Sequence, residues 1–413
     1  MWKGELMVNK LKLGLIIDET MDHLGGAENV MRRFFEYLDQ DEFHVSLFYI
    51  NYHNVFPLSF FKHRYIKSKN DIYFLNLPGF LAQVSNHLPK RPCSTPGDKM
   101  SFRKYISVII KLIFVYTFNR DILFQLQNND IIYVFSETQL IYIFLPLIFI
   151  SKSLKSRVIY GTHTYLPVTF RFRNKIENKL LDWTTSRIHY TSNLVYRLSN
   201  IKRKGDFVLP LGVDTNIYYP DYKVHDKIRF LFVGRLVKYK GIQELLKAWE
   251  LFTNHTLLEL HIVGGGELEG LVIGASKRIQ SIIYHGTVED KILPNIYRSC
   301  DIFVFPTYGI EFGEFFGLVV LEAISSGEYV ILSDKLKGVF DDFETKGVLE
   351  YVPVDPFSIF SKMKRSAEDI LELRSRCIDV REYIVRTYNW KVVIDEFSKI
   401  IRGINQSNHE SLK

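Results

Sequence analysis

Two glutamates flank an apolar run in the last third of the chain. Glu314 and Glu322 lie eight residues apart around Phe-Phe-Gly-Leu-Val-Val-Leu, and Gly317 is expected to begin a helix there. Ionised carboxylates accept hydrogen bonds from neighbouring hydroxyl groups, and the first helical N–H groups, from Phe316 to Leu318, suit hydroxyl or phosphate oxygens. The pair predicts a ligand site, although a helix with a charged entrance and one buried or rim glutamate gives the same pattern.

Two cations bracket a second loop, in the sequence FVGRLVKYKG. Gly234 ends an expected strand, Arg235 and Lys240 flank the loop, and Gly241 begins the next helix. A fork-shaped guanidinium and a point-like ammonium near a helix N-terminus match the charge of a diphosphate leaving group. A solvated surface loop is the alternative, but the bracketing glycines favour the phosphate interpretation.

Two loops nearer the N-terminus carry weaker signals. Gly25 and Gly26 precede a helix, where they either let backbone N–H groups approach an anion or form a tight turn. His163 follows an expected strand, a position typical of ligand sites, but a lone histidine is also common as a structural or exposed residue.

The elements that position these loops alternate between β-branched runs and helical stretches, which is typical of parallel sheets covered by helices. Helices are predicted at 27–38 and 241–252. Strands are predicted at 11–18, 43–50, 71–77, 131–135, 157–163 and 187–192, and in a second series at 228–236, 258–264, 282–288, 301–307 and 329–334. A link containing Pro and Gly at 208–227 separates the two series, so we predict domains over 1–212 and 213–387. The fold class is α/β, with two doubly wound domains whose ligands lie at the carboxyl ends of the strands.

Composition narrows the class of protein. The 413 residues suit two domains, and 47% of them are hydrophobic. Cys93, Cys300 and Cys377 are sparse and have no Cys-x-x-Cys spacing, which favours a reducing compartment over disulfides or a zinc site. The longest apolar run, 140–150, is too short to span a bilayer and contains Pro146. We therefore expect a cytoplasmic protein without a secretory signal.

The positive charge is unevenly distributed. The chain carries a formal charge of +7, and residues 60–120 contain eleven Lys and Arg against two Asp. Residues 102–120 would suit docking on anionic lipid at the inner face of the cell membrane, and an ordinary packed helix with a cationic rim explains them equally well. Nucleic acid is a third, less favoured partner for such charge.

In order and spacing, these segments resemble the retaining glycosyltransferases of family 4. The resemblance covers nearly the whole chain and includes GGAENV, FLFVGRLVKYKGIQELLKAW, LHIVGGGELEGL, GEFFGLVVLEAISSG and YNWKVVIDEF. It implies the GT-B fold, in which two Rossmann-like domains face each other across a cleft. It also implies that a terminal helix, at about 388–413, packs back onto the first domain.

The resemblance implies a role for each matching residue. Glu314 would orient the donor sugar, Glu322 would hold the ribose hydroxyls, and the base would lie near Val288. The implied catalytic residues are Glu314, His163, Arg235 and Lys240. The implied donor-binding residues are Gly25, Gly26, Gly234, Arg235, Lys240, Val288, Phe316, Gly317, Leu318 and Glu322. The chain departs from the family pattern at Phe315, where Gly is usual, and at Glu328-Tyr329, where a Thr-Pro or similar pair is common.

The implied activity is transfer of a hexosyl unit, with retention, from a nucleotide diphosphate sugar to a hydroxyl group. A UDP-sugar is the expected donor. A glycan or a polyprenyl-diphosphate-linked oligosaccharide is the expected acceptor, as in capsule, O-antigen, lipopolysaccharide or other surface-polysaccharide synthesis. We expect no cofactor and no metal, because the one Asp-x-Asp, at Asp39 and Asp41, follows a helix rather than a strand. A nucleotide-sugar epimerase of the same fold and a catalytically silent partner protein are the alternatives.

Overall fold

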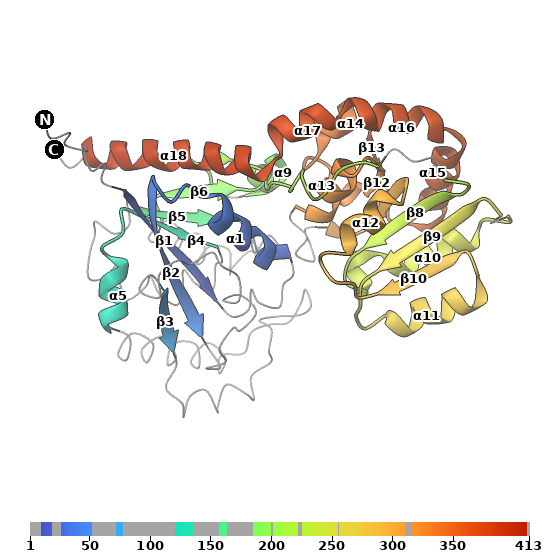
Figure 1. Cartoon of the computed structure of the whole chain (residues 1–413), viewed down its shortest axis with the longest axis horizontal. Coiled ribbons are helices and arrows are strands. Elements are labelled where there is room, and N and C mark those ends of the chain that lie inside the picture. The colour runs from blue at the N-terminus through green and yellow to red at the C-terminus, as the bar shows by residue number, and fades with distance from the viewer. Residues whose placement is uncertain are drawn as a thin grey trace, which may run out of the picture. The chain divides into compact units, whose positions relative to one another are not determined.

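The structure is a computed structural model of the 413-residue chain. It describes residues 10–18, 26–51, 72–76, 120–135, 157–162, 185–199, 201–221, 225–254, 256–309 and 316–410. The chain divides into two compact units (Figure 1). The N-terminal unit comprises Met1–Thr191, Val195–Leu209 and Ile394–Lys413, and the C-terminal unit comprises Ser192–Leu194 and Pro210–Val393.

A parallel seven-stranded sheet forms the centre of the N-terminal unit. Its strand order is β3-β2-β1-β4-β5-β6-β7, the order of a doubly wound sheet extended by one strand. The elements are β1 (Leu11–Asp18), α1 (Gly26–Tyr37), β2 (Phe43–Asn51), β3 (Ile72–Asn76), α5 (Arg120–Leu126), β4 (Ile131–Val134), β5 (Val158–Gly161), β6 (Arg187–Tyr190), α9 (Asn193–Leu198) and β7 (Phe207–Val208). Every residue of β4 and β5 is buried, because parallel strands are covered on both faces.

One buried polar chain crosses the core of this unit. Tyr133 of β4 donates its hydroxyl to His189 Nδ1 over 2.6 Å, and His189 Nε2 donates to the Leu209 carbonyl over 2.7 Å. Burial lowers the pKa of His189 to about 4, so the imidazole is neutral at neutral pH. Because both ring nitrogens are bonded, the histidine fastens β4 and β6 to the segment after β7.

A parallel six-stranded sheet forms the centre of the C-terminal unit. Its strand order is β10-β9-β8-β11-β12-β13. The elements are β8 (Ile228–Val233), η5 (Lys238–Lys240), α10 (Ile242–Glu250), β9 (Leu258–Val263), α11 (Glu269–Arg278), β10 (Ile282–Gly286), α12 (Leu293–Arg298), β11 (Ile302–Phe305), α13 (Leu318–Ser325), β12 (Tyr329–Ser333), η7 (Asp334–Leu336), α14 (Asp341–Thr345), β13 (Leu349–Val352), α15 (Pro356–Glu368), α16 (Ile370–Asp379) and α17 (Arg381–Thr387). Neighbouring strands β8 and β11 bring their following loops to one edge of the sheet.

The predicted α/β class with two doubly wound parallel sheets is confirmed. All eleven predicted strands are present, and the sheets each contain one further strand, β7 and β13. Both additional strands are edge strands of two and four residues. Such short runs give little periodic signal.

The segment predicted as a link packs within the C-terminal unit over residues 210–221. The Val213 N–H donates to the Tyr388 carbonyl over 2.7 Å, and Arg381 donates to the Tyr218 carbonyl over 3.1 Å. Asp214 accepts from the N–H groups of Asn216 and Ile217, which closes a turn. The segment is therefore an ordered part of that unit.

The last helix, α18 (Trp390–Glu410), contributes Trp390 to Val393 to the C-terminal unit and its remainder to the N-terminal unit. Within the N-terminal unit, the Phe397 ring lies 5.0 Å from Phe34 of α1 and 5.2 Å from Tyr133. Arg402 forms an ion pair of 3.0 Å with Glu42. Aromatic packing thus fixes the helix to this unit, since an exposed ion pair adds little.

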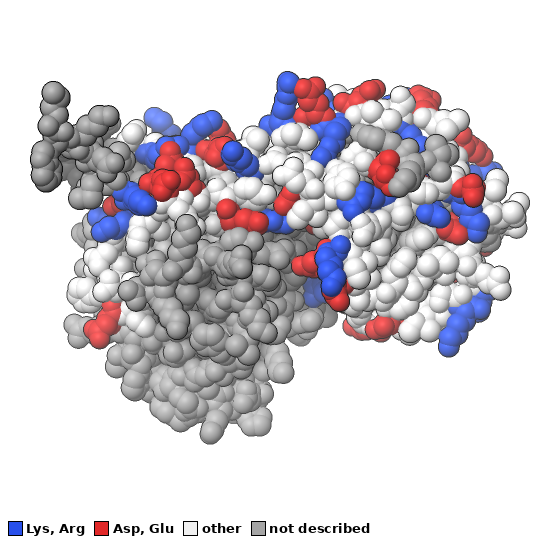
Figure 2. Space-filling model, in the orientation of Figure 1, with Lys and Arg blue, Asp and Glu red and all other residues white. Residues whose placement is uncertain are grey.

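Most of the basic stretch noted in the sequence, residues 60–120, lies outside the described residues. On the visible face of α14 to α17, cationic and anionic side chains are interspersed (Figure 2). Of the helices that the structure describes, none has the length and apolar character needed to cross a bilayer.

Candidate functional site

The loop after β8 carries the two predicted cations. Gly234 and Arg235 follow the strand directly, and Lys240 ends the short helix η5. Gly241 caps the next helix, α10, with φ of 72°, a backbone conformation that favours glycine. A Cβ at this position would lie 1.9 Å from the Pro306 carbonyl oxygen, so a larger residue would push apart the loops after β8 and β11.

Hydrogen bonds join these two loops. The Tyr239 carbonyl accepts from the Tyr308 N–H over 2.8 Å and from the Thr307 hydroxyl over 3.1 Å. Lys240 Nζ lies 4.8 Å from the centre of the Phe305 ring, at the end of β11. The cationic loop is therefore held against the segment that leads towards Glu314.

The two cations influence each other. Arg235 is exposed and donates to the Tyr239 hydroxyl, and its guanidinium carbon lies 5.8 Å from that ring. Lys240 is half-buried as a residue, but its Nζ lies over the Phe305 and Tyr239 rings. Burial, with a smaller effect of Arg235, lowers the pKa of Lys240 to about 7. An anion beside this pair would restore the charged form of the lysine.

Glycines bring the loops after β9 and β10 against the same edge. The Gly264 N–H donates to the Gly286 carbonyl over 2.8 Å, and a Cβ on Gly264 would lie 1.9 Å from the Gly234 carbonyl oxygen. A Cβ on Gly265 would lie 2.8 Å from Thr287 Oγ1, next to the half-buried Val288. The structure thus places the loops of Gly234 and Val288 on either side of one glycine-rich turn.

The helix that carries Glu322 begins as predicted, within one residue. Phe316 is buried against Phe340 at 5.1 Å, and Gly317 precedes α13 with φ of 72°. Leu318 is the first helical residue, and the first N–H groups of an α-helix have no partner within the helix. Glu322 lies in the second turn, and its Oε2 accepts from the Tyr297 hydroxyl over 3.0 Å.

The structure therefore groups Gly234, Arg235, Lys240 and Val288 along one sheet edge, with Phe316, Gly317, Leu318 and Glu322 on the element after β11. Gly26 is the first residue of α1. Gly25, His163 and Glu314 lie outside the described residues. Sequence reasoning missed Tyr239 and Tyr297, which touch the predicted cations and Glu322. Tyr239 stands between the cations in YKG, whereas nothing in the sequence around Tyr297 marks it.

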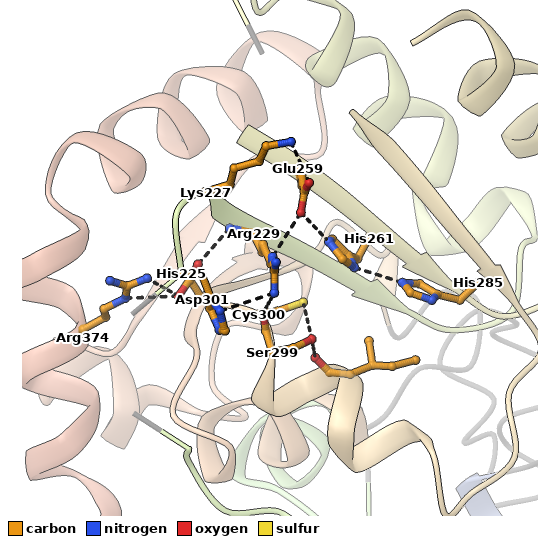
Figure 3. Close-up of polar contacts among 11 residues, drawn as sticks. His225, Lys227, Arg229, Glu259, His261, His285, Ser299, Cys300, Asp301 and Arg374 are labelled. Atoms are coloured by element: carbon orange, nitrogen blue, oxygen red, sulfur yellow. Dashed lines mark hydrogen bonds and ion pairs between the residues drawn. The ribbon is translucent and has the colours of Figure 1, made fainter. Parts of the chain in front are cut away.

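A separate polar network begins at the amino ends of β8 and β11 and crosses β9 to β10 (Figure 3). Asp301 accepts from Arg374 over 2.6 Å and from the Arg229 N–H over 2.9 Å. Glu259 accepts from Lys227 over 2.9 Å and pairs with His261 over 3.3 Å. Asp301 and Glu259 lie at or near the amino ends of β11 and β9, opposite the candidate site, whereas His285 lies next to Gly286 at the carboxyl end of β10. We therefore assign the ion pairs of this network to stability.

The charges of this network are mutually compensated. Burial opposes ionisation of Glu259, but hydrogen bonds from Lys227 and His261 outweigh it and lower its pKa to about 2. Burial lowers the pKa of His261 and of His285, which lie 3.0 Å apart between ring nitrogens. Among the described residues, no three His, Cys, Asp or Glu side chains are arranged to hold a metal ion.

The C-terminal unit matches a known family. Residues 220–379 match the family model described as "Glycosyl transferases group 1". Over these residues the chain is similar to that family, and the matched stretch is well under half of the 413 residues. The match includes the loops of Arg235, Lys240 and Val288 as well as α13.

Curated relatives show the same similarity. Over 208 residues the chain is 29% identical to a phosphatidyl-myo-inositol mannosyltransferase of Mycobacterium tuberculosis (strain CDC 1551 / Oshkosh), covering 48% of this chain and 53% of the relative. The chain thus spans about half the length of the curated relatives that it matches first.

Solved structures show the fold over nearly the whole chain. Sucrose-phosphate synthase from Thermosynechococcus elongatus has a TM-score of 0.71 and 17% identity, covering 96% of this chain and 100% of that one. Anabaena HepE in complex with UDP has a TM-score of 0.70 and 14% identity, covering 95% and 100%. The predicted GT-B fold class is confirmed, and at these identities the likeness concerns the fold alone.

Proposed function

We propose that this protein is a retaining glycosyltransferase, which moves a hexosyl unit from a nucleotide diphosphate sugar to a hydroxyl group. One observation carries the proposal: within the residues similar to glycosyl transferases group 1, two neighbouring cations and a helix bearing a hydrogen-bonded glutamate follow adjacent strands of one sheet. A UDP-sugar is the proposed donor. HepE, which shares the fold, has been solved with UDP and with UDP-glucose.

Each group at the sheet edge has a proposed part in donor binding. Arg235 and Lys240 neutralise the diphosphate, and Glu322 accepts hydrogen bonds from the ribose hydroxyls. The base lies against the backbone near Val288, and N–H groups at the start of α13 hold polar oxygens of the donor. Glu314 orients the sugar.

Roles for His163, Gly25 and Gly26 are proposed from the family resemblance alone. His163 would contact the donor sugar, and the glycines would bring backbone N–H groups to its phosphates. Arg235 and Lys240 are proposed as catalytic residues together with Glu314 and His163.

The proposed chemistry breaks the bond between the anomeric carbon and the phosphate oxygen while the acceptor oxygen bonds to that carbon. Negative charge grows on the departing phosphate, where the two cations stabilise it. Removing one such preorganised contact costs about 3–4 kcal/mol in the barrier. The acceptor proton passes to the departing phosphate on the same face of the sugar, which accounts for retention without a covalent nucleophile. No metal or cofactor has a part in this scheme.

The proposed acceptor is a glycan or a lipid-linked oligosaccharide in surface-polysaccharide synthesis. The mycobacterial relative supports this choice, because its name pairs mannosyl transfer with a phosphatidyl-myo-inositol. We place the protein in the cytoplasm, with peripheral contact to anionic lipid at the membrane.

Thermal-shift measurements with a panel of UDP-, GDP- and ADP-sugars test the donor, and NMR of the product tests the anomeric configuration. Arg235→Ala and Lys240→Ala are each expected to lower kcat by at least about 100-fold. Lys238→Ala is the matched control, since this exposed lysine lies in the same short helix. Wild-type turnover by either variant, or isomerisation of the donor without acceptor, would overturn the proposal.

A further inference from the structure

The glutamate proposed to hold the ribose already has a partner within the protein. Tyr297, near the end of α12, donates its hydroxyl to Glu322 Oε2 over 3.0 Å. The Val319 carbonyl, one turn earlier on α13, lies 3.4 Å from the same hydroxyl. A phenol has one proton to donate, and the shorter contact is the one to Glu322.

The phenol ring is fixed from several sides. Tyr297 has no exposed surface, and its ring meets Tyr218 edge to face at 5.5 Å and Phe303 of β11 at 6.0 Å. The Tyr218 carbonyl accepts from Ser325 Oγ, at the end of α13, over 2.7 Å. The ring is therefore held between the segment before β8, the sheet and the helix that carries Glu322.

The hydroxyl keeps its proton at neutral pH. Burial raises the pKa of Tyr297 well above 10.0, and the nearby Glu322 carboxylate raises it further. Tyr297 is consequently a permanent hydrogen-bond donor to the carboxylate.

We propose that Tyr297 is a positioning residue, which orients the Glu322 carboxylate so that it receives both hydroxyl groups of a nucleotide ribose. This inference rests on the proposed function. A carboxylate offers about four lone-pair positions, and Tyr297 occupies one of them on Oε2. An ionised carboxylate accepts several hydrogen bonds at once, so the bond from Tyr297 is compatible with bonds from ribose hydroxyl groups. Holding the side chain in this orientation before binding reduces the entropy lost when the ribose binds.

The test measures the binding of UDP and of 2′,3′-dideoxy-UDP by isothermal titration calorimetry. Tyr297→Phe is expected to weaken UDP binding about tenfold, equivalent to about 1.4 kcal/mol, because a hydrogen bond to a charged group is lost. Binding of the dideoxy nucleotide is expected to change less than about twofold. The preference of the protein for ribose hydroxyls should thus shrink by the same tenfold factor.

Two further variants control for packing. Tyr297→4-fluorophenylalanine, inserted by amber suppression, fills the volume of the hydroxyl without donating, and it replaces Tyr297→Phe if that variant does not fold. Tyr383→Phe removes a hydrogen bond of 2.7 Å to Asp342 in the same unit, and it is expected to leave both affinities unchanged.

If the Tyr297 variants weaken the binding of UDP and of the dideoxy nucleotide equally, or weaken neither, the inference is overturned and the tyrosine has a structural role. If the wild-type protein binds UDP and prefers its ribose hydroxyls, but the variants keep that preference, the inference alone fails. If the wild-type protein does not bind UDP, the proposed donor fails with it.

Discussion

Glu328 provides a sharp test of the energetics of the C-terminal unit. It follows Gly327 and directly precedes β12, and it has no exposed surface. Neither carboxyl oxygen has a hydrogen-bond partner among the residues that the structure describes. Burial, with a smaller effect of Asp301, raises the pKa of Glu328 well above 4.5. The folded protein therefore holds this carboxyl group as the neutral acid.

The pH dependence follows from proton counting. Above about pH 4.5 the unfolded chain releases this proton while the folded chain keeps it, so the folded state binds more protons. The contribution of Glu328 to the unfolding free energy is therefore fully present below pH 4.5, and it is lost as the pH rises towards the pKa of Glu328 in the folded protein. The loss is about 1.4 kcal/mol per pH unit, and it amounts to no more than about 3.4 kcal/mol at pH 7.

Glu328→Gln removes the titration and nearly preserves the shape. Unfolding free energies from urea denaturation, measured between about pH 5 and pH 8, should give a difference between variant and wild type that grows in favour of glutamine by about 1.4 kcal/mol per pH unit. Glu289→Gln removes a glutamate whose side chain is 67% exposed, and it controls for the loss of one surface charge. A difference independent of pH over this range would refute the assignment of a neutral Glu328.

Three further outcomes are expected. Because the pKa of Lys240 is lowered to about 7, UDP binding should be accompanied by uptake of a proton, and the affinity for UDP should fall about tenfold per pH unit above pH 7. The Lys240→Arg variant should bind UDP with little pH dependence, because arginine stays charged. Calorimetry at several pH values measures both affinities, and the same pH dependence in variant and wild type would contradict this prediction. His189 is neutral in the folded protein and gains a proton on unfolding below about pH 6.5, so this residue should lower the unfolding free energy by up to about 3 kcal/mol between pH 6.5 and pH 4. Urea denaturation at the two pH values measures this loss, and the His189→Gln variant should lack it. Gly241→Ala should destabilise the protein by more than about 2 kcal/mol, because Gly241 has a positive φ and an added Cβ would meet the Pro306 carbonyl. Gly270→Ala is the control, because an added Cβ there has nothing within 4 Å, and it should not destabilise the protein. Similar thermal midpoints for the two variants would refute the close approach at Gly241.

The fold was predictable because its central strands are largely buried and apolar. Runs such as 230–233 and 302–305 are apolar throughout and are followed by Gly234 and Pro306, so their type and order were evident from the sequence. The edge strands β7 and β13 were missed because an edge strand needs less apolar surface and can be very short. The packing of residues 210–221 depends on Arg381, which lies more than 160 residues later in the chain, so no local pattern could indicate it.

The candidate site was predictable where a chemically suitable side chain lies beside a glycine that marks a turn or a helix start. The bracketing glycines marked the loop of Arg235 and Lys240, and Gly317 marked the start of α13. Tyr297 was not predictable, because its contact with Glu322 joins two helices across 25 residues. Glu328 was noted only as a departure from a family pattern, since its burial depends on the whole C-terminal unit.

The charged side chains at the two ends of the C-terminal sheet are arranged differently. At one end they are paired with opposite charges, and at the other two like charges are neighbours. At the amino ends, Asp301 and Glu259 are each bonded to cations, so the charges there are compensated without any ligand. At the carboxyl ends, Arg235 and Lys240 are neighbours whose repulsion contributes to the lowered pKa of the lysine. Proximity of like charges destabilises the free protein, and an anion between them relieves that cost as it binds. In the proposed function, the free energy stored in this pair becomes part of the affinity for the diphosphate of the donor, while the bonded network at the other end stabilises the sheet.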